Sequence, residues 1–268
     1  MSRIERVRAS LRKGGAVFIR SAEPSDVGAL RDFESHMLAN NPFGVREPGE
    51  AQRTEQEDRQ RIERFVREPG WLMLTAWTAN RHEELVGELS FRAGERRKLA
   101  HHGSFGLSVH AAWRGRGVGS AMIHALLAWA AAHRQIEKVT LGVFETNTEA
   151  RRLYERLGFV EESRALRYFK IGPGRYVDDV QMAIYVKPGV APAGFKTWPI
   201  VEAKGRGGKG AVGGAAGGAA GGGAAKGAGP SGQAAVSGSG GPPTGAVSGS
   251  ATSVPPVAPS VPTPAGGA

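Results

Sequence analysis

The segment Val109-His110-Ala111-Ala112-Trp113-Arg114-Gly115-Arg116-Gly117-Val118-Gly119-Ser120 decides the fold of this chain. A predicted strand ends here, three alternating glycines follow, and a predicted helix over 117–133 begins. The first N–H groups of a helix are unpaired and carry partial positive charge, so they favour an anion. Glycines let the backbone approach that anion, and Arg114 and Arg116 offer forked donors suited to phosphate oxygens. The segment therefore predicts a phosphate or pyrophosphate site.

Spacing excludes the two commonest phosphate loops and several other kinds of active site. Ser120 and Met122 stand where a Rossmann loop needs its third glycine, and no Gly-Lys-Ser/Thr follows for a Walker loop. The chain has no cysteine and no G-x-S-x-G, which removes a cysteine nucleophile, thiolate metal sites and a serine-hydrolase elbow. His101-His102 is a pair without a third ligand, so we expect no metal site.

Hydrophobic periodicity predicts an α/β domain around this segment. A helix is expected from Val27 to the stop at Asn40-Asn41-Pro42, and strands and helices then alternate in the order β-α-α-β-β-β-α-β-α-β-β, which implies a mixed sheet with flanking helices. The strands are predicted at 17–20, 71–78, 84–92, 103–110, 138–144, 159–169 and 178–186, and the later helices at 53–67, 117–133 and 149–157.

Composition divides the chain into three parts. Residues 1–16 are basic and polar and predict a frayed arm, residues 17–188 carry the periodic segments of one domain, and residues 189–268 hold 23 of the 40 glycines. This last part is rich in Gly, Ala, Pro and Ser, so we expect a disordered tail that cannot offset its ordering entropy.

The net charge of +10 raises the possibility of a polyanion partner. The basic residues of the tail are few and lack interleaved aromatics, so we expect nucleic-acid binding to be at most weak. The N-terminus lacks the apolar core of a signal peptide, and the longest uncharged stretch of the domain, 117–133, is short for a membrane span. The expectation is a cytoplasmic protein without membrane contact.

Two motifs in order resemble those of one enzyme family. Arg114-x-x-Gly117-x-Gly119 is similar to the R/Q-x-x-G-x-G/A signature of the Gcn5-related N-acetyltransferases (GNAT), and Asn147-x-x-Ala150-x-x-Leu153-Tyr154-x-x-x-Gly158-Phe159 resembles a segment that follows it in that family. The resemblance runs from about Val17 to Val186 and implies a mixed sheet splayed at its centre. The segments 103–109 and 174–183 look like those of a bacterial subgroup that acetylates amino acids.

The resemblance also implies where acetyl-CoA would bind. The signature loop would wrap the pyrophosphate, the strand before it would hold the pantetheine and the thioester carbonyl through free backbone N–H groups, and Asn147 would contact the cofactor. Read from the residues alone, Asn147 could equally cap the helix that follows it. The implied cofactor-binding residues are Leu107, Ser108, Val109, Arg114, Gly115, Arg116, Gly117, Val118, Gly119, Ser120 and Asn147.

For catalysis, Tyr154 matches the position of the family's general acid to the CoA thiolate, although a half-buried packing role fits the same residue. Glu88 is the first candidate for the general base, acting through water if burial raises its pKa, and an outward, solvated carboxylate is the alternative. His110 is a second candidate base. Without cysteine, direct attack on the thioester is favoured over an acyl-enzyme.

The expected function is transfer of an acetyl group from acetyl-CoA to a primary amine, an amino acid or another small amine. Specificity is expected from residues 37–67 and 167–179, with a homodimer as an option. The alternatives left open are a protein lysine or N-terminal acetyltransferase, and a non-catalytic CoA-binding or polyanion-binding protein.

Overall fold

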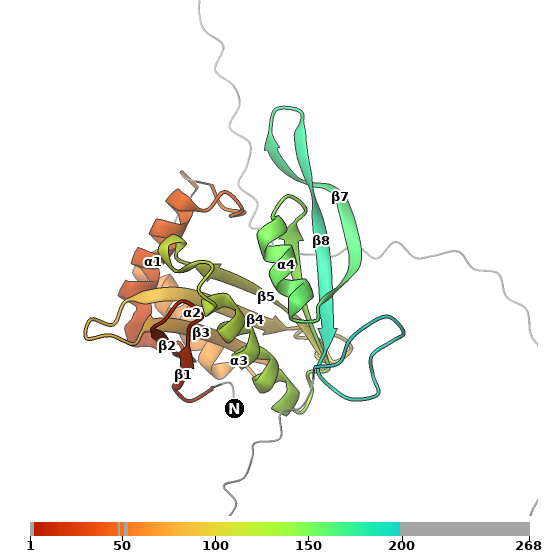
Figure 1. The fold of residues 1–268 in the computed structure, drawn as a ribbon, viewed down its shortest axis with the longest axis horizontal. Coiled ribbons are helices and arrows are strands. Elements are labelled where there is room, and N and C mark those ends of the chain that lie inside the picture. The colour runs from red at the N-terminus through yellow and green to blue at the C-terminus, as the bar shows by residue number, and fades with distance from the viewer. Residues whose placement is uncertain (1–2, 48, 51–52, 199–268) are drawn as a thin grey trace, which may run out of the picture. The chain divides into compact units, whose positions relative to one another are not determined.

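A computed structural model describes residues 3–47, 49–50 and 53–198, and its centre is one eight-stranded mixed sheet (Figure 1). The strand order is β1-β2-β3-β4-β5-β6-β8-β7, antiparallel except where β5 meets β6. The predicted α/β class is confirmed, and each predicted helix and strand is found within a few residues. The bounds are β1 Val7–Ser10, β2 Ala16–Ser21, α1 Val27–Asn40, α2 Glu55–Arg67, β3 Trp71–Thr78, β4 Leu85–Ala93, β5 His102–Val109, α3 Val118–Ala132, β6 Lys138–Phe144, α4 Thr148–Arg156, β7 Val160–Gly172 and β8 Arg175–Tyr185.

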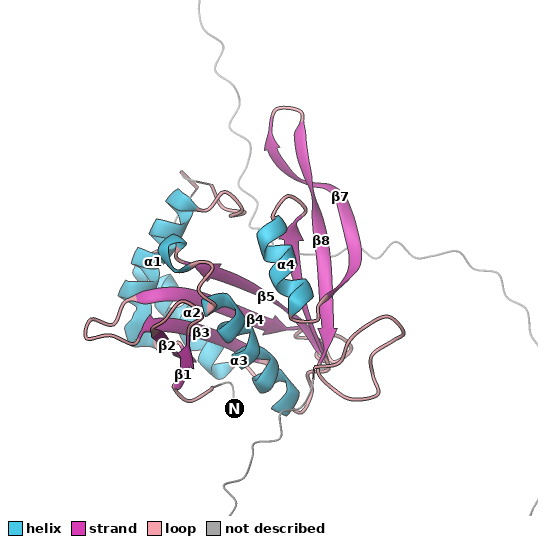
Figure 2. Cartoon of the chain, viewed as in Figure 1, coloured by secondary structure: helices cyan, strands magenta, loops and turns pink. Residues whose placement is uncertain are grey.

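The helices cover both faces of the sheet, with α3 and α4 on one face and α1 and α2 on the other (Figure 2). Strand β3 shows the division, because successive side chains of a strand point to opposite faces. Leu72 and Leu74 enter the core beneath α3, whereas Trp71 and Met73 pack against α1 and α2. Both faces of this central strand are therefore buried, which explains its continuous apolar sequence.

The sheet is splayed between β5 and β6, as the family resemblance implied. These strands pair in parallel from His102 with Lys138 to Ser104 with Thr140, and this pairing ends there. Beyond it, β5 continues along β4 up to Val109, while β6 continues along β8 up to Phe144. The two halves of the sheet thus diverge toward the ends of β5 and β6, and a wedge opens between them.

The predicted N-terminal arm is corrected by the structure. Residues Val7–Ser10 form β1, an edge strand paired with β2, and Leu11 is buried in the main core. The strand escaped prediction because its four residues are mostly exposed and show no apolar alternation.

The described chain also continues beyond the predicted domain boundary at 188. Thr197 forms a bridge with Tyr185, and the Trp198 backbone N–H donates to the carbonyl of Tyr185. Residues 189–198 therefore return to the last strand, whereas the rest of the predicted tail lies outside the described residues.

Candidate active site

A cavity of about 810 Å³ occupies the wedge between the two halves of the sheet. Its size falls within the range of pockets that hold small-molecule ligands. It is bordered by β5, the loop after it and the start of α3 on one side, and by β6, α4 and the β7–β8 hairpin on the other. The predicted site residues that line it are Glu88, Leu107, Ser108, Val109, Arg114, Gly115, Gly117, Val118, Gly119, Ser120, Asn147 and Tyr154.

The loop between β5 and α3 presents backbone N–H groups to this cavity. Gly115 and Gly117 have φ angles of +66° and +102°, a left-handed conformation that other residues rarely adopt. Gly117 is the N-cap of α3 and brings no side chain to cap it. The first N–H groups of α3, from Val118 to Ser120, therefore remain available to an anion.

The two arginines of the loop lie differently. Arg114 lines the cavity, and its Nε donates to the carbonyl of Val109 at 3.1 Å, which fixes the guanidinium beside the loop. The Arg116 guanidinium instead stacks over the Trp113 ring at 4.7 Å. A further arginine that the sequence did not single out, Arg12, also lines the cavity, and its backbone N–H donates to the Arg116 carbonyl at 2.9 Å.

The last residues of β5 offer two backbone donors toward the wedge. The His110 N–H donates to the Val86 carbonyl on the β4 side. Because N–H groups alternate in direction along a strand, those of Leu107 and Val109 point the opposite way, where β6 has diverged. Fixed donors of this kind can stabilise an oxygen that gains negative charge without reorganising during the reaction.

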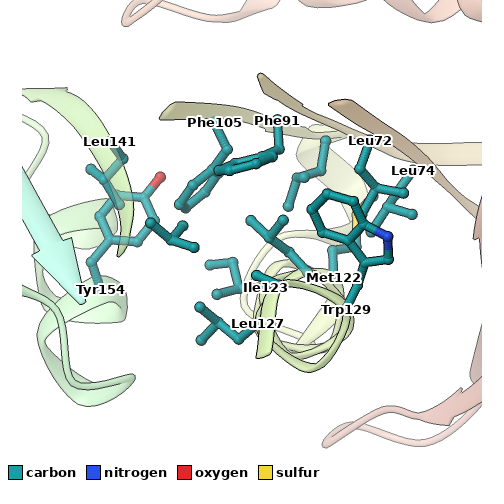
Figure 3. Close-up of a cluster of buried hydrophobic side chains, with 14 of the residues drawn as sticks. Leu72, Leu74, Phe91, Phe105, Met122, Ile123, Leu127, Trp129, Leu141 and Tyr154 are labelled. Atoms are coloured by element: carbon teal, nitrogen blue, oxygen red, sulfur yellow. The ribbon is translucent and has the colours of Figure 1, made fainter. Parts of the chain in front are cut away.

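Tyr154 lies on the α3–α4 face of the sheet, within the core. Figure 3 shows its ring opposite Phe105 and beside Leu141, and Phe105 meets it edge-on with centroids 6.0 Å apart. The residue is 8% exposed, and burial raises the pKa of its phenol to about 12. A phenol with this pKa stays protonated at neutral pH and can donate a hydrogen bond to a neighbouring anion.

Glu88 lies on the opposite face, where β4 faces α1 and α2. Its carboxylate accepts a hydrogen bond from Arg61 of α2 at 2.8 Å, and its side chain is 12% exposed. Arg61 also pairs with Glu34 of α1 at 2.6 Å. Burial raises the pKa of Glu88, while the Arg61 charge opposes that rise. A raised pKa makes this carboxylate a better proton acceptor near neutral pH.

Two other predicted residues have local partners. The Asn147 side chain accepts from the Ala150 N–H at 3.2 Å, so it caps α4 while lining the cavity. His110 accepts from the Ala112 N–H and stacks on His36 with centroids 4.1 Å apart. Burial lowers the pKa of His110. Its ring is thus held by α1 rather than by the residues of the cavity.

Neither a metal-binding cluster nor a membrane-spanning helix is found in the part of the chain that the structure describes. Within it, no cluster of three or more His, Asp or Glu side chains is arranged to hold an ion. Over the same residues, no helix is both long and apolar enough to cross a bilayer.

The predicted specificity segments 37–67 and 167–179 both contribute residues that line the cavity, although sequence reasoning did not single out most of these residues. Phe43 follows α1, Phe144 ends β6 and Asp179 belongs to β8; they meet through tertiary packing, and their local sequence carries no signal. The further lining residues from the predicted specificity segments are Met37, Asn41, Gly44, Val45, Arg61, Tyr168 and Phe169.

A sheet that splays between two parallel strands, beside a glycine-rich loop and a helix N-terminus without a side-chain cap, is the arrangement that the resemblance to the GNAT acetyltransferases implied. The model of the GNAT acetyltransferase family matches residues 37–159, which include both halves of the wedge. This match and the relatives below support a GNAT-type N-acetyltransferase that depends on acetyl-CoA.

One curated protein is similar in sequence, and two solved structures are similar in fold. The chain is 28% identical over 168 residues to the L-amino acid N-acetyltransferase AaaT of Escherichia coli K12, a match that covers 62% of this chain and 96% of that protein. A GNAT-family acetyltransferase from Streptococcus pneumoniae has a similar structure, with a TM-score of 0.60 and 22% identity over 64% of this chain and 99% of the other. The structure of yncA from Salmonella typhimurium, solved with acetyl-CoA, has a TM-score of 0.56 and 19% identity, and the match covers 66% of this chain and 98% of yncA.

Proposed function

We propose that this enzyme acetylates the primary amine of an amino acid or a similar small molecule by direct attack on the thioester of acetyl-CoA. The observation that carries the proposal is the arrangement of the cavity, because the diverging strands leave the N–H groups of Leu107 and Val109 unpaired between Tyr154 and Glu88. The 28% identity to an L-amino acid N-acetyltransferase over almost all of that protein's length supports an amino-acid acceptor.

The loop residues would hold the pyrophosphate of acetyl-CoA, which supplies the activated acetyl group. The N–H groups at the start of α3 and the Arg114 guanidinium are donors for phosphate oxygens, and Gly115 and Gly117 keep side chains out of their way. The amide nitrogen of Asn147 is the group left for a cofactor contact, since its oxygen caps α4.

Glu88 and Tyr154 would accept and donate the protons from opposite faces of the sheet. A bound ammonium must lose one proton before its nitrogen can attack, and the Glu88 carboxylate would accept it, directly or through water. In the transfer itself the neutral amine and the thioester become an amide and a thiol. The Tyr154 hydroxyl would donate a hydrogen bond to the departing sulfur, which the high pKa of this phenol allows at all working pH values.

We place the acceptor on the side of the cavity bordered by the segment after α1, by β6 and by the β7–β8 hairpin, and call it the acceptor side. Its aromatic side chains favour a small molecule over a protein as the acceptor. Phe43 meets Phe144 edge-on with centroids 6.2 Å apart, and Phe144 stacks on Phe169 at 3.9 Å. These contacts join the segment after α1 to β6 and the β7–β8 hairpin, which narrows this side of the cavity.

The test is release of free CoA thiol from acetyl-CoA by the purified full-length chain. The acceptors are L-methionine, L-phenylalanine, phenylalanine amide, phenethylamine and a peptide with a free N-terminus. Turnover of the small amines above the peptide supports the proposal. Turnover of the peptide alone would reassign the enzyme to protein acetylation, and CoA binding without turnover would make it a non-catalytic domain.

A further inference from the structure

A buried carboxylate on the acceptor side of the cavity has no cationic partner. Asp179 of β8 is 7% exposed, and its Oδ2 accepts from the Gln181 amide at 2.5 Å. Its Oδ1 has no hydrogen-bond partner among the described residues, and no arginine, lysine or histidine of that part of the chain forms an ion pair with it. A buried carboxylate without a partner is costly, so the site is incomplete without a donor from a ligand.

The position of Asp179 follows from the register of the sheet. Its neighbour Val180 points into the core beneath α3, so Asp179 points to the opposite face, the one that also carries Glu88. Both carboxylates line the same cavity from opposite halves of the splayed sheet. They differ in charge balance, because Glu88 is paired with Arg61.

The neighbouring strand leaves space for this carboxylate. A Cβ atom added at Gly142 of β6 would lie 2.9 Å from Asp179 Oδ1 and 2.8 Å from the Gln181 amide nitrogen. These distances are shorter than side-chain contacts allow, and Gly142 has no left-handed φ that would otherwise require glycine. Glycine at position 142 therefore leaves room for the Asp179 carboxylate and for the part of the cavity next to it.

The surrounding side chains select the kind of ligand that would complete the site. Phe144 lies opposite Asp179 across the β6–β8 pairing, and it is stacked on Phe169. Aromatic faces attract cations and pack against apolar groups, and a carboxylate attracts cations and repels anions. The combination fits a protonated amine carried on an apolar or aromatic body.

We propose that Asp179 binds the cationic nitrogen of the acceptor and thereby selects protonated amines with an apolar body as substrates. This inference rests on the proposed function, which it extends by assigning an acceptor-binding residue. Asp179 holds the ammonium form and contributes to binding, whereas the proton is removed by Glu88 from the other half of the sheet.

The test compares Asp179→Asn with the wild type, using phenethylamine as the acceptor and 2-phenylethanol as its neutral inhibitor of similar shape. We expect the KM for phenethylamine to rise about 10- to 100-fold, the range for losing a hydrogen bond to a charged group. The KM for acetyl-CoA and the inhibition constant of 2-phenylethanol should stay within about twofold, because neither involves the ammonium contact. Gly142→Ala should weaken phenethylamine as well, since its Cβ would displace the carboxylate.

Asp32→Asn is the matched control, because it makes the same change at an exposed residue of α1 that does not line the cavity. It should leave the KM for phenethylamine within about twofold. An unchanged KM in Asp179→Asn overturns the inference, and so does an equal weakening of phenethylamine and 2-phenylethanol, which would indicate a packing role.

Calorimetry of phenethylamine binding separates this inference from the proposed function. If the wild type turned over no amine, the proposed function would fail. The inference would then stand only if phenethylamine bound to the wild type and bound at least tenfold more weakly to Asp179→Asn. Absence of phenethylamine binding to the wild type would overturn the inference, whereas the proposed function would still be decided by turnover of the other acceptors.

Discussion

Replacing Arg61 by methionine should move the acidic limb of the pH–rate profile to higher pH. Arg61 is the cation that opposes the burial-raised pKa of Glu88, and the two groups are 2.8 Å apart. At an effective dielectric constant of about 20, two charges at that separation attract by about 6 kcal/mol. Loss of this attraction could move the acidic limb by at most about 4 pH units. Because the Arg61 charge is shared between Glu88 and Glu34, we expect the acidic limb to move by less than this, by about 1–3 pH units.

The sign follows from the role of the carboxylate. A base must be unprotonated to accept a proton, so the rate falls as the pH drops through the pKa of Glu88. Removing a neighbouring positive charge raises that pKa further, and the limb moves toward alkaline pH. Methionine keeps most of the apolar length of the side chain, and Glu34 retains Arg53 at 2.8 Å as a partner.

The assay measures kcat against pH at saturating acetyl-CoA and amine, with the same amine for each variant, so that any difference reports the enzyme alone. Arg59→Met is the matched control, since Arg59 lies on the same helix and pairs with Glu55. Glu88→Gln should remove the limb. A limb that stays in place in Arg61→Met, or that survives in Glu88→Gln, would refute Glu88 as the base.

Three further predictions concern the cofactor, the proton donor and the C-terminal part of the chain. Arg114→Ala should weaken acetyl-CoA binding by about 1–3 kcal/mol, the range for a hydrogen bond to a charged group. Gly117→Asp should abolish binding, because aspartate would be strained at φ +102° and would repel phosphate. Calorimetry of acetyl-CoA binding checks both variants, with Arg152→Ala, at an exposed position, as a control that should bind normally. Tyr154→Phe should lower kcat by about 10²- to 10⁴-fold with acetyl-CoA affinity retained, and a kcat near that of the wild type would leave Tyr154 a packing role only. Deleting residues 202–268, which contain no Trp, Tyr, Phe, Leu or Ile, should leave melting temperature and turnover within error of the full chain, so lost turnover would contradict a dispensable tail.

The glycine loop and the start of α3 could be predicted from sequence because their geometry is local. A strand, a glycine loop and a helix start are encoded within about a dozen consecutive residues, so Gly115, Gly117 and the free N–H groups of α3 follow from short-range rules. Tyr154 belongs to the same category, since its place on α4 is set by a motif that begins at Asn147.

The residues of the acceptor side could not be predicted in this way, because the pairing register of distant strands and the packing of helices bring them together. Gly142 and Asp179 come together only through the antiparallel pairing of β6 with β8, and a shift of one residue would turn Asp179 into the core. Arg61 reaches Glu88 only because α2 packs on β3, the strand next to β4, and a charged helix offers many arginines that look equivalent in sequence. Pairings of this kind depend on distant segments and leave no local pattern.

The edge strand β1 has a consequence for how this enzyme can be shortened or tagged. Two residues just after β1, Leu11 and Arg12, support the glycine loop. Leu11 is buried in the core, and the Arg12 backbone N–H donates a hydrogen bond to the Arg116 carbonyl. The Arg12 side chain also passes 3.6 Å from the position where a Cβ on Gly117 would be. A chain begun at Val17, where composition alone would place the domain boundary, would keep both proposed catalytic side chains yet lose part of the support that holds the glycine loop in shape.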